Sequence, residues 1–341
     1  MQSRSNGAEK SSWEELIESG IDSQTRLPYG VSRYYAALAK VSDPKADPIA
    51  AQYMPQPEEG RTLPHESSDP IGDNRYLVSP RLVHHYHDRA LLLVNDRCAT
   101  YCRHCFRRHF TGHGGGRLGE AELAAAASYL RRTPEVREIL LSGGDPLMLE
   151  DRDIEHILRT LKDVNPDYII RLCTRMPIVL PSRITEDFAE MLAGFSGIWV
   201  VIHANHPREL TSEVRTACRR LLGAGAPVLN QAVLLRGVND DASVLEALFR
   251  GLLRFGIKPY YLFQGDLAIG TAHFRVPIER GLELMRELRS RLSGMALPTY
   301  AVDVPGGGKV PIESSLLRIE AEAYVLRGPD GGEYRYPREL A

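Results

Sequence analysis

The stretch ALLLVNDRCATYCRHCFRRHF, residues 90–110, joins an apolar run to a cluster of cysteines and basic side chains. The apolar run is typical of a buried β-strand, and three cysteines follow it with the spacing C-x₃-C-x₂-C: Cys98, Cys102 and Cys105. Three thiolates on one short loop can bind zinc or an iron–sulfur cluster. Because a [4Fe–4S] cluster normally takes four cysteines, three would leave one iron open to a small molecule.

Further apolar runs continue the pattern that residues 90–95 begin. They alternate with amphipathic stretches, which predicts strands alternating with helices. The predicted strands are 90–95, 138–143, 168–173, 198–203, 228–235 and 258–263, with a last one at 298–304. The predicted helices are 118–131, 151–163, 183–194, 208–223, 241–255 and 277–292. Six successive βα units predict the α/β class, with a parallel sheet closed partly into a TIM-like (β/α)6 barrel.

The rest of the chain is expected to surround this barrel, which we place at residues 81–315. Residues 1–11 are small and polar and are expected to be disordered. Residues 12–80 predict a helical and extended region, with helical patterns in WEELIES (13–19) and RYYAALAKV (33–41). The tail, 316–341, contains a glycine turn within 323–337 that predicts a β-hairpin.

Composition limits the kinds of partner. The net charge is −2, which gives no overall attraction to nucleic acid, and no apolar run approaches the length that spans a membrane. The N-terminus lacks the apolar core of a signal peptide. Three of five cysteines are clustered, which disfavours a disulfide framework and favours a reducing cytoplasm.

Nearly every chemically active group directly follows a predicted strand. In a (β/α) barrel such positions converge on one mouth, where active sites lie. Each group also has a plainer interpretation: the cysteines could hold zinc with Cys173 or His104 as a further ligand, and the aspartates could cap helices or turns. Other polar groups could be satisfied core residues, and a lysine could face solvent. The groups are Cys98, Cys102, Cys105, Ser142–Asp145, Thr174, Arg175, His203, Gln231, Asp266, Asp303 and Lys309.

Several longer motifs carry a resemblance to a known family. They are YCRHCFRRHF, LLSGGDPL, RMPIVLPSRIT, NHPREL, NQAVLLRGVND, PYYLFQGDLAIGTAHFR and DVPGGGKVP, and they occur in order across roughly residues 80–315. This series resembles the lysine 2,3-aminomutase family of radical S-adenosylmethionine (SAM) enzymes.

The resemblance implies three cofactors and their ligands. Cys98, Cys102 and Cys105 would hold a [4Fe–4S] cluster whose open iron binds SAM. Lys309 would carry pyridoxal 5′-phosphate (PLP). The remaining cofactor contacts would be Arg89 to the PLP phosphate, Ser142, Gly143, Gly144 and Asp145 to the SAM amino group, and Thr174, Arg175, His203 and Gln231 to SAM or PLP. Two positions differ from the usual family pattern: His85 replaces a second arginine, and three glycines instead of four precede Lys309.

The resemblance also implies the reaction and the substrate. Arg107 would bind the substrate carboxylate, and Asp266 with Asp303 would hold a side-chain cation. Two carboxylates in one mouth repel each other unless a cation lies between them, so the substrate is expected to be basic. The implied reaction moves the α-amino group of a basic L-amino acid, L-lysine first, to the β-carbon, in an isomerase of the L-lysine 2,3-aminomutase type.

Several alternatives stay open at the level of sequence. They are an arginine 2,3-aminomutase, the short branch that supplies β-lysine for elongation factor P, a radical SAM enzyme without PLP, and a non-enzymatic iron–sulfur or zinc protein. For the enzyme we expect a reducing electron donor such as a flavodoxin or a ferredoxin. We also expect a homo-oligomer.

Overall fold

The computed structural model describes residues 17–20, 27–113, 115–304 and 306–338. Its centre is a ten-stranded sheet with the order β12-β11-β10-β9-β8-β7-β6-β5-β4-β3. Neighbouring strands from β5 to β11 are parallel, whereas β3, β4 and β12 add antiparallel edges. The strands are β3 Leu77–Ser79, β4 Leu82–Tyr86, β5 Arg89–Asn95, β6 Glu138–Gly143, β7 Ile169–Thr174, β8 Ile198–Ile202, β9 Val228–Val233, β10 Lys258–Phe263, β11 Thr299–Val304 and β12 Gly308–Pro311.

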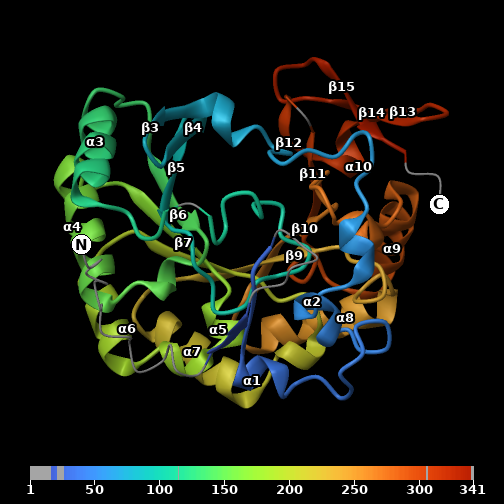
Figure 1. Cartoon of the computed structure of the whole chain (residues 1–341), viewed down its shortest axis with the longest axis horizontal. Coiled ribbons are helices and arrows are strands. Elements are labelled where there is room, and N and C mark those ends of the chain that lie inside the picture. The colour runs from blue at the N-terminus through green and yellow to red at the C-terminus, as the bar shows by residue number, and fades with distance from the viewer. Residues whose placement is uncertain (1–16, 21–26, 114, 305, 339–341) are drawn as a thin grey trace, which may run out of the picture.

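Helices cover the outer side of this curved sheet, as Figure 1 shows. One helix follows each strand from β5 to β10, so the partial TIM-like barrel of the radical SAM type is confirmed. The main helices are α3 Glu120–Arg131, α4 Asp151–Val164, α6 Glu186–Ala193, α7 Ser212–Gly223, α8 Ala242–Arg254 and α9 Ile278–Arg291. A short α5, Met176–Val179, lies between β7 and α6. Thr185, Thr211 and Asp241 cap α6, α7 and α8 by accepting from backbone N–H groups of the first turn.

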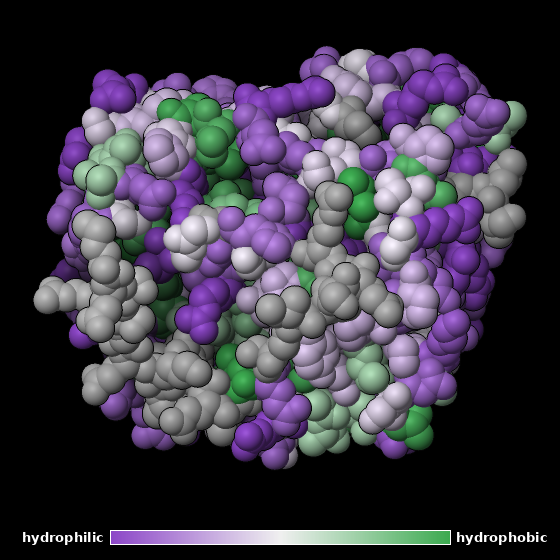
Figure 2. All heavy atoms as spheres, in the orientation of Figure 1, coloured by the Kyte–Doolittle hydropathy of each residue, from purple (hydrophilic) through white to green (hydrophobic). Residues whose placement is uncertain are grey.

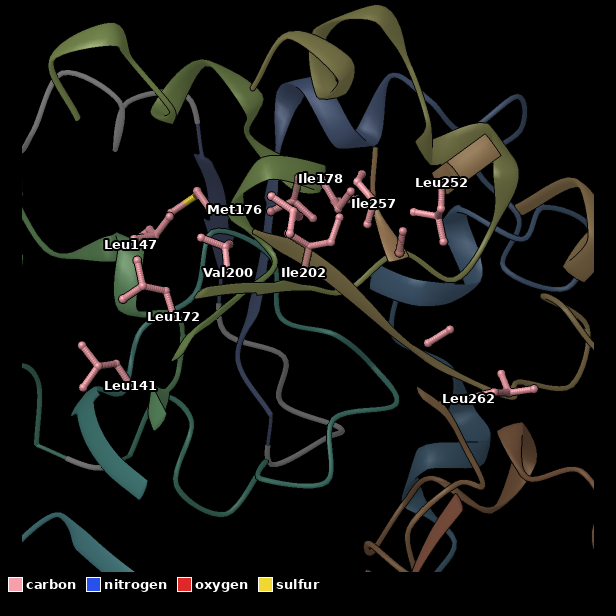
Figure 3. Packing of buried hydrophobic residues seen from close by; sticks show 14 of the residues in the cluster. Leu141, Leu147, Leu172, Met176, Ile178, Val200, Ile202, Leu252, Ile257 and Leu262 are labelled. Atoms are coloured by element: carbon pink, nitrogen blue, oxygen red, sulfur yellow. The ribbon is translucent and has the colours of Figure 1, made fainter. Parts of the chain in front are cut away.

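Alternation along the strands separates a packed outer face from a more open interior. On β6, Ile139 and Leu141 are buried against the helices, whereas Leu140 and Ser142 are only half-buried. The same period of two holds on β7 and β9. Figure 3 shows the outer layer, where residues of strands, helices and connecting loops pack together: Leu141, Leu147, Leu172, Met176, Ile178, Val200, Ile202, Leu252, Ile257 and Leu262. The half-buried residues of these strands therefore share the inner face of the curved sheet.

The N-terminal segment differs from the sequence prediction. The helix expected over 13–19 is wrong for its described part, because Ile17–Gly20 forms strand β1 and pairs with β2, Tyr29–Ser32. The second expected helix is confined to α1, Arg33–Ala36, and a further short helix, α2, spans Ala50–Tyr53. Residues 1–11, expected to be disordered, lie outside the described residues.

The C-terminal tail forms a small separate sheet. Strands β14, Ala323–Arg327, and β15, Glu333–Pro337, make the predicted hairpin, and β13, Leu316–Ile319, adds a strand that the sequence did not indicate. A four-residue helix, α10, Ile312–Ser315, joins this sheet to β12. On the face shown in Figure 2, hydrophilic residues predominate. Among the described residues, no helix has the length and apolar character needed to cross a membrane.

Candidate active site

The cysteine loop begins where β5 ends and is held by the N-terminal segment. The backbone N–H of Tyr101 donates to the carbonyl of Gly30 at 2.9 Å, and that of Arg103 donates to Gln52 at 2.9 Å. Arg103 is fully buried, and its guanidinium makes two hydrogen bonds, of 2.8 and 2.7 Å, to the equally buried Glu59 carboxylate. A buried, bidentate ion pair of this kind fixes the loop, since either charge alone would be costly there.

The Gly143-Gly144-Asp145 turn fastens the other side of the cysteine loop. The N–H of Gly144 donates to the carbonyl of Asn95 at 2.6 Å, and that of Asp145 donates to Arg97 at 2.8 Å. A Cβ added to Gly144 would lie 2.4 Å from the Arg97 carbonyl oxygen. Gly144 is therefore required for the close approach of this turn to the cysteine loop.

Asp145 has its carboxylate satisfied by the protein. One oxygen accepts from Thr174 Oγ1 at 2.6 Å and from Leu147 N at 3.0 Å, and the other accepts from Arg175 N at 2.7 Å. Burial nevertheless raises its pKa above the ordinary value. The helix-cap interpretation is thus confirmed, because Asp145 caps the short 3₁₀ helix Pro146–Met148. Thr174 also accepts from Met176 N at 2.9 Å.

The three thiols are half-buried and lie close to one another. Burial, followed by neighbouring negative charge, raises the pKa of Cys98 and Cys105. Bound iron would remove this penalty by stabilising the thiolates. In the described part of the chain, no group of three or more His, Cys, Asp or Glu side chains surrounds a single-ion position. A [4Fe–4S] cluster would bind each of the three thiolates through a different iron.

The two candidate additional ligands lie in other surroundings. Cys173 is on β7, where burial raises its pKa to about 11 and its charged neighbours are Arg171, Arg107 and Lys309. His104 is enclosed, its Nε2 lies 3.4 Å from Asn205 Nδ2, and burial holds its pKa well below the usual value. Among the described residues, neither side chain forms a group with the thiols that could hold one metal ion.

Arg175 is fully committed to a buried network. Its guanidinium donates to the carbonyl of His203, to Cys102 Sγ and to Glu209. His203 and Gln231, by contrast, are half-buried at the inner ends of β8 and β9. Burial, together with the charges of Arg175 and Lys309, lowers the pKa of His203 to about 4. The imidazole of His203 is therefore neutral at physiological pH.

Lys309 points into the barrel. On β12 it pairs in register with Asp303, and its Nζ lies 3.9 Å from Asp303 Oδ2. The same Nζ is 4.4 Å from the ring centroid of Phe263 and 5.1 Å from that of Tyr261. Its backbone N–H donates to Tyr86 Oη at 3.0 Å, which joins the β12 edge of the sheet to β4. The shortened glycine run thus still directs the amine inward.

Asp266 and Asp303 lie near each other and near Lys309. Burial, and then the charge of Asp303, raises the pKa of Asp266 to about 8, even though nearby cations oppose this. Such a shift favours the protonated form of the Asp266 carboxyl at neutral pH. A cation placed between the two carboxyl groups would release that proton.

Two arginines lie near these residues, since the charge of Arg107 acts on Asp266 and that of Arg89 acts on Tyr86. Arg107 Nε and Nη2 each lie 2.9 Å from Asp73 Oδ2, and a cavity of about 140 Å³ lies beside them, with His109 and Phe110 in its wall. Arg89 pairs with Asp88 at 2.9 Å, and its guanidinium carbon is 4.1 Å from the ring centroid of Tyr86.

Several functional neighbours were not predicted from the sequence. The inward direction of Tyr261 and Phe263 could not be found from a simple alternation, because the strand's burial pattern and register are interrupted between Pro259 and Tyr261. Asp73, Tyr86 and Glu209 carried no sequence signal, because their roles depend on partners far away in the chain.

Comparisons with known proteins agree with this geometry. The model of the Radical SAM superfamily matches residues 92–248. A protein of Treponema pallidum, provisionally named L-lysine 2,3-aminomutase, is 42% identical over 332 residues, which cover 95% of this chain and 94% of the relative. The L-lysine 2,3-aminomutase of Bacillus subtilis is 38% identical over 94% of this chain and 68% of its own length. The glutamate 2,3-aminomutase of Clostridioides difficile is 38% identical over 89% of this chain and 71% of its own length. This chain therefore belongs to the lysine 2,3-aminomutase family of radical SAM enzymes.

Proposed function

We propose that this isomerase moves the α-amino group of a basic L-amino acid, with L-lysine preferred, to the β-carbon. One feature carries the choice of substrate: the charge of Asp303 helps to raise the pKa of the buried Asp266 carboxyl, and both aspartates lie near the inward-facing Lys309. A side-chain ammonium would replace the proton on Asp266, whereas a glutamate side chain would add a third negative charge. The site therefore favours a cationic side chain over the substrate named for the Clostridioides difficile relative.

The chain's own residues divide into cofactor holders and substrate holders. We propose that Cys98, Cys102 and Cys105 hold the [4Fe–4S] cluster, that Lys309 carries PLP, and that Arg89 binds the PLP phosphate. Together the bound cluster, SAM and PLP supply a carbon radical and an electron-accepting ring. Further SAM and PLP contacts are proposed for Ser142, Gly143, Gly144, His203 and Gln231, whereas Asp145, Thr174 and Arg175 are proposed to support the site without a direct contact.

The hydrogen bonds of Asp145 and Thr174 support a more specific proposal for these two residues. The side chains of Asp145 and Thr174 bind one another and nearby backbone, so we propose that they shape the SAM site instead of reaching SAM through a free carboxylate. His203 and Gln231 are half-buried on the inner side of the strands and remain direct candidates. A neutral His203 can accept as well as donate a hydrogen bond.

The two ends of the substrate are proposed to bind at opposite sides of the barrel interior. Arg107 receives the α-carboxylate through its planar guanidinium, which Asp73 holds in place. Asp266 and Asp303 receive the side-chain cation. Lys309, between Asp303 and the rings of Tyr261 and Phe263, is then positioned to exchange with the substrate α-amino group.

The place of this enzyme in the cell is part of the same proposal. We expect a cytoplasmic enzyme that receives electrons from a small reducing protein such as a flavodoxin or ferredoxin. We also expect a homo-oligomer.

The test is anaerobic reconstitution with iron, sulfide, PLP and SAM, followed by chromatography of products from lysine, arginine and glutamate. We expect β-lysine as the fastest product. Faster formation of β-arginine would refute lysine as the substrate and establish the arginine alternative. The β-lysine supply role for elongation factor P is distinguished by testing whether deletion of this enzyme removes β-lysine from that protein in cells.

A second arm tests the PLP assignment. We expect Lys309→Ala to lose the visible absorbance of lysine-bound PLP and all aminomutase activity, and the exposed Lys45→Ala control to keep both. An active Lys309→Ala variant would support a radical SAM enzyme without PLP. A reduced cluster that fails to cleave SAM would overturn the enzyme proposal altogether.

A further inference from the structure

Arg175 places a cation against one of the three clustered thiols. Its Nη1 lies 2.8 Å from Cys102 Sγ, within hydrogen-bonding distance. Of the arginine side chain, 8% is exposed, so solvent screens this interaction weakly.

The remaining donors of Arg175 fix its orientation. Nε donates to the carbonyl of His203 at 3.2 Å, and Nη2 lies 2.8 Å from Glu209 Oε1 and 2.9 Å from Tyr35 Oη. Nη2 also donates to Gln52 Oε1. Each of the three side-chain nitrogens therefore has a partner within the protein, and these contacts fix the direction in which Nη1 points.

Glu209 supplies the opposite charge and is held as firmly. Its side chain is fully buried, and its second oxygen accepts from the backbone N–H groups of Asn205 at 2.6 Å and His206 at 2.7 Å. Tyr35 Oη donates to its first oxygen at 2.7 Å. The ion pair thus has a defined position, and it links the N-terminal segment to the loops after β7 and β8.

We propose that Arg175 is a positioning residue that raises the reduction potential of the [4Fe–4S] cluster through its hydrogen bond to Cys102, with Glu209 partly offsetting its charge. This rests on the proposed cluster ligands and not on the identity of the substrate. It also replaces the simpler expectation that Arg175 contacts SAM or PLP directly, because each of its three side-chain nitrogens already has a partner within the protein.

The direction follows from electrostatics. Reduction adds one electron, taken from the external reductant, and brings the cluster from the 2+ to the 1+ state, which increases the negative charge on the thiolate sulfurs. A cationic N–H donor stabilises that charge, and hydrogen bonds to the sulfurs are among the factors that set such potentials. Loss of Arg175 should therefore make the potential more negative, and loss of the Glu209 charge should make it more positive.

The experiment is an anaerobic redox titration of the reconstituted enzyme, without SAM, followed by electron paramagnetic resonance. We expect Arg175→Met to shift the midpoint to a more negative value, Arg175→Lys to shift it less, and Glu209→Gln to shift it in the opposite direction. The matched control is Arg208→Lys, since Arg208 pairs with Asp47 at 2.9 Å and joins the N-terminal segment to the loop after β8. That control should keep the wild-type potential.

The opposite signs separate an electrostatic role from a structural one. Loosened packing would move the Arg175 and Glu209 variants in the same direction, and this result would overturn the proposal. So would Arg175→Met with full iron content and an unchanged potential. If Arg175→Met does not retain the cluster, Arg175→Lys and Glu209→Gln still decide by their signs. Failure of the wild-type chain to assemble a cluster would instead reject the proposed ligands.

Discussion

The protonated Asp266 is the residue with the most direct functional consequence. Its pKa of about 8 reflects burial first and the charge of Asp303 second. Below that pH the free site carries a proton that must leave when a cation binds between the carboxylates. Substrate binding and proton release are thereby coupled at this one residue.

A pH series should reveal this coupling. As the pH rises towards about 8, Asp266 ionises and the KM for lysine should fall, by up to roughly tenfold per pH unit, and then level off. The lysine side chain itself stays protonated to about pH 10, so it does not limit this range. The measurement is KM against pH for the wild type and for Asp266→Asn. Titration of the substrate α-amino group is common to both proteins, so the difference between their slopes reports Asp266. Equal slopes for the two proteins would contradict a proton on Asp266 in the free site.

Arg107 provides a second test at the scale of a single side chain. Arg107→Lys keeps the charge but loses the planar fork, and charged hydrogen bonds contribute about 1.5–3 kcal/mol each. We expect kcat/KM for lysine to fall roughly 10- to 100-fold, with the iron content unchanged. The neighbouring Arg108, which lies 2.7 Å from Glu59, is a less suitable control because it helps to hold the cysteine loop. The exposed Arg159→Lys on α4 is the better one.

At the scale of elements, the contact between the turn after β6 and the loop after β5 decides whether the cysteines are in place. Gly144→Ala would put a methyl group within 2.4 Å of the Arg97 carbonyl oxygen, so one of the two loops must move. We expect a loss of about 1–3 kcal/mol in the free energy of unfolding and a lower iron content after reconstitution. Chemical denaturation and iron analysis measure these two effects.

Gly223→Ala is the matched control for that substitution. Gly223 ends α7, is exposed, and has no atom within 4 Å of an added Cβ. Alanine there should leave the iron content unchanged and stabilise the chain by up to about 1 kcal/mol. Full iron loading of the Gly144→Ala variant would show that the close approach is not required.

Local patterns predicted most of the barrel. The strands from β5 to β11 begin and end within two residues of the ranges read from the sequence, because apolar runs and their alternation are properties of neighbouring residues. The N-terminal segment was harder. WEELIES has a helical pattern, yet Ile17–Gly20 pairs as a strand with β2, because a partner distant in sequence outweighs a short local preference.

The sequence predicted the candidate site residues, but it did not predict the carboxylates that pair with the arginines around them. Cys98, Cys102, Cys105, Asp266, Asp303 and Lys309 were marked by residue type and position after strands. The partners that orient the neighbouring arginines were not, since Glu59, Asp73 and Glu209 are joined to them only by the fold. A side chain that acts through a distant partner leaves no periodic signal.

At the scale of the whole molecule, the C-terminal sheet supports the acidic pair from outside the barrel. Tyr336 on β15 donates from Oη to the carbonyl of Gly265 at 2.6 Å, directly before Asp266. Tyr336→Phe leaves that buried carbonyl without this donor, which should cost about 1–3 kcal/mol and raise the KM for lysine. Tyr334→Phe removes only an exposed bond to Asp330 and should change neither value. Equal behaviour of the two variants would show that the C-terminal sheet does not support the site.

The hydrogen bond from the Lys309 backbone to Tyr86 has a consequence for turnover. Because this amide is hydrogen-bonded to Tyr86 on β4, the exchange proposed for the Lys309 amine needs only rotation about its own side-chain bonds while the peptide stays still. Each catalytic cycle can then finish without β12 and β4 moving apart. Deuterium uptake at that amide should accordingly be slower than product formation.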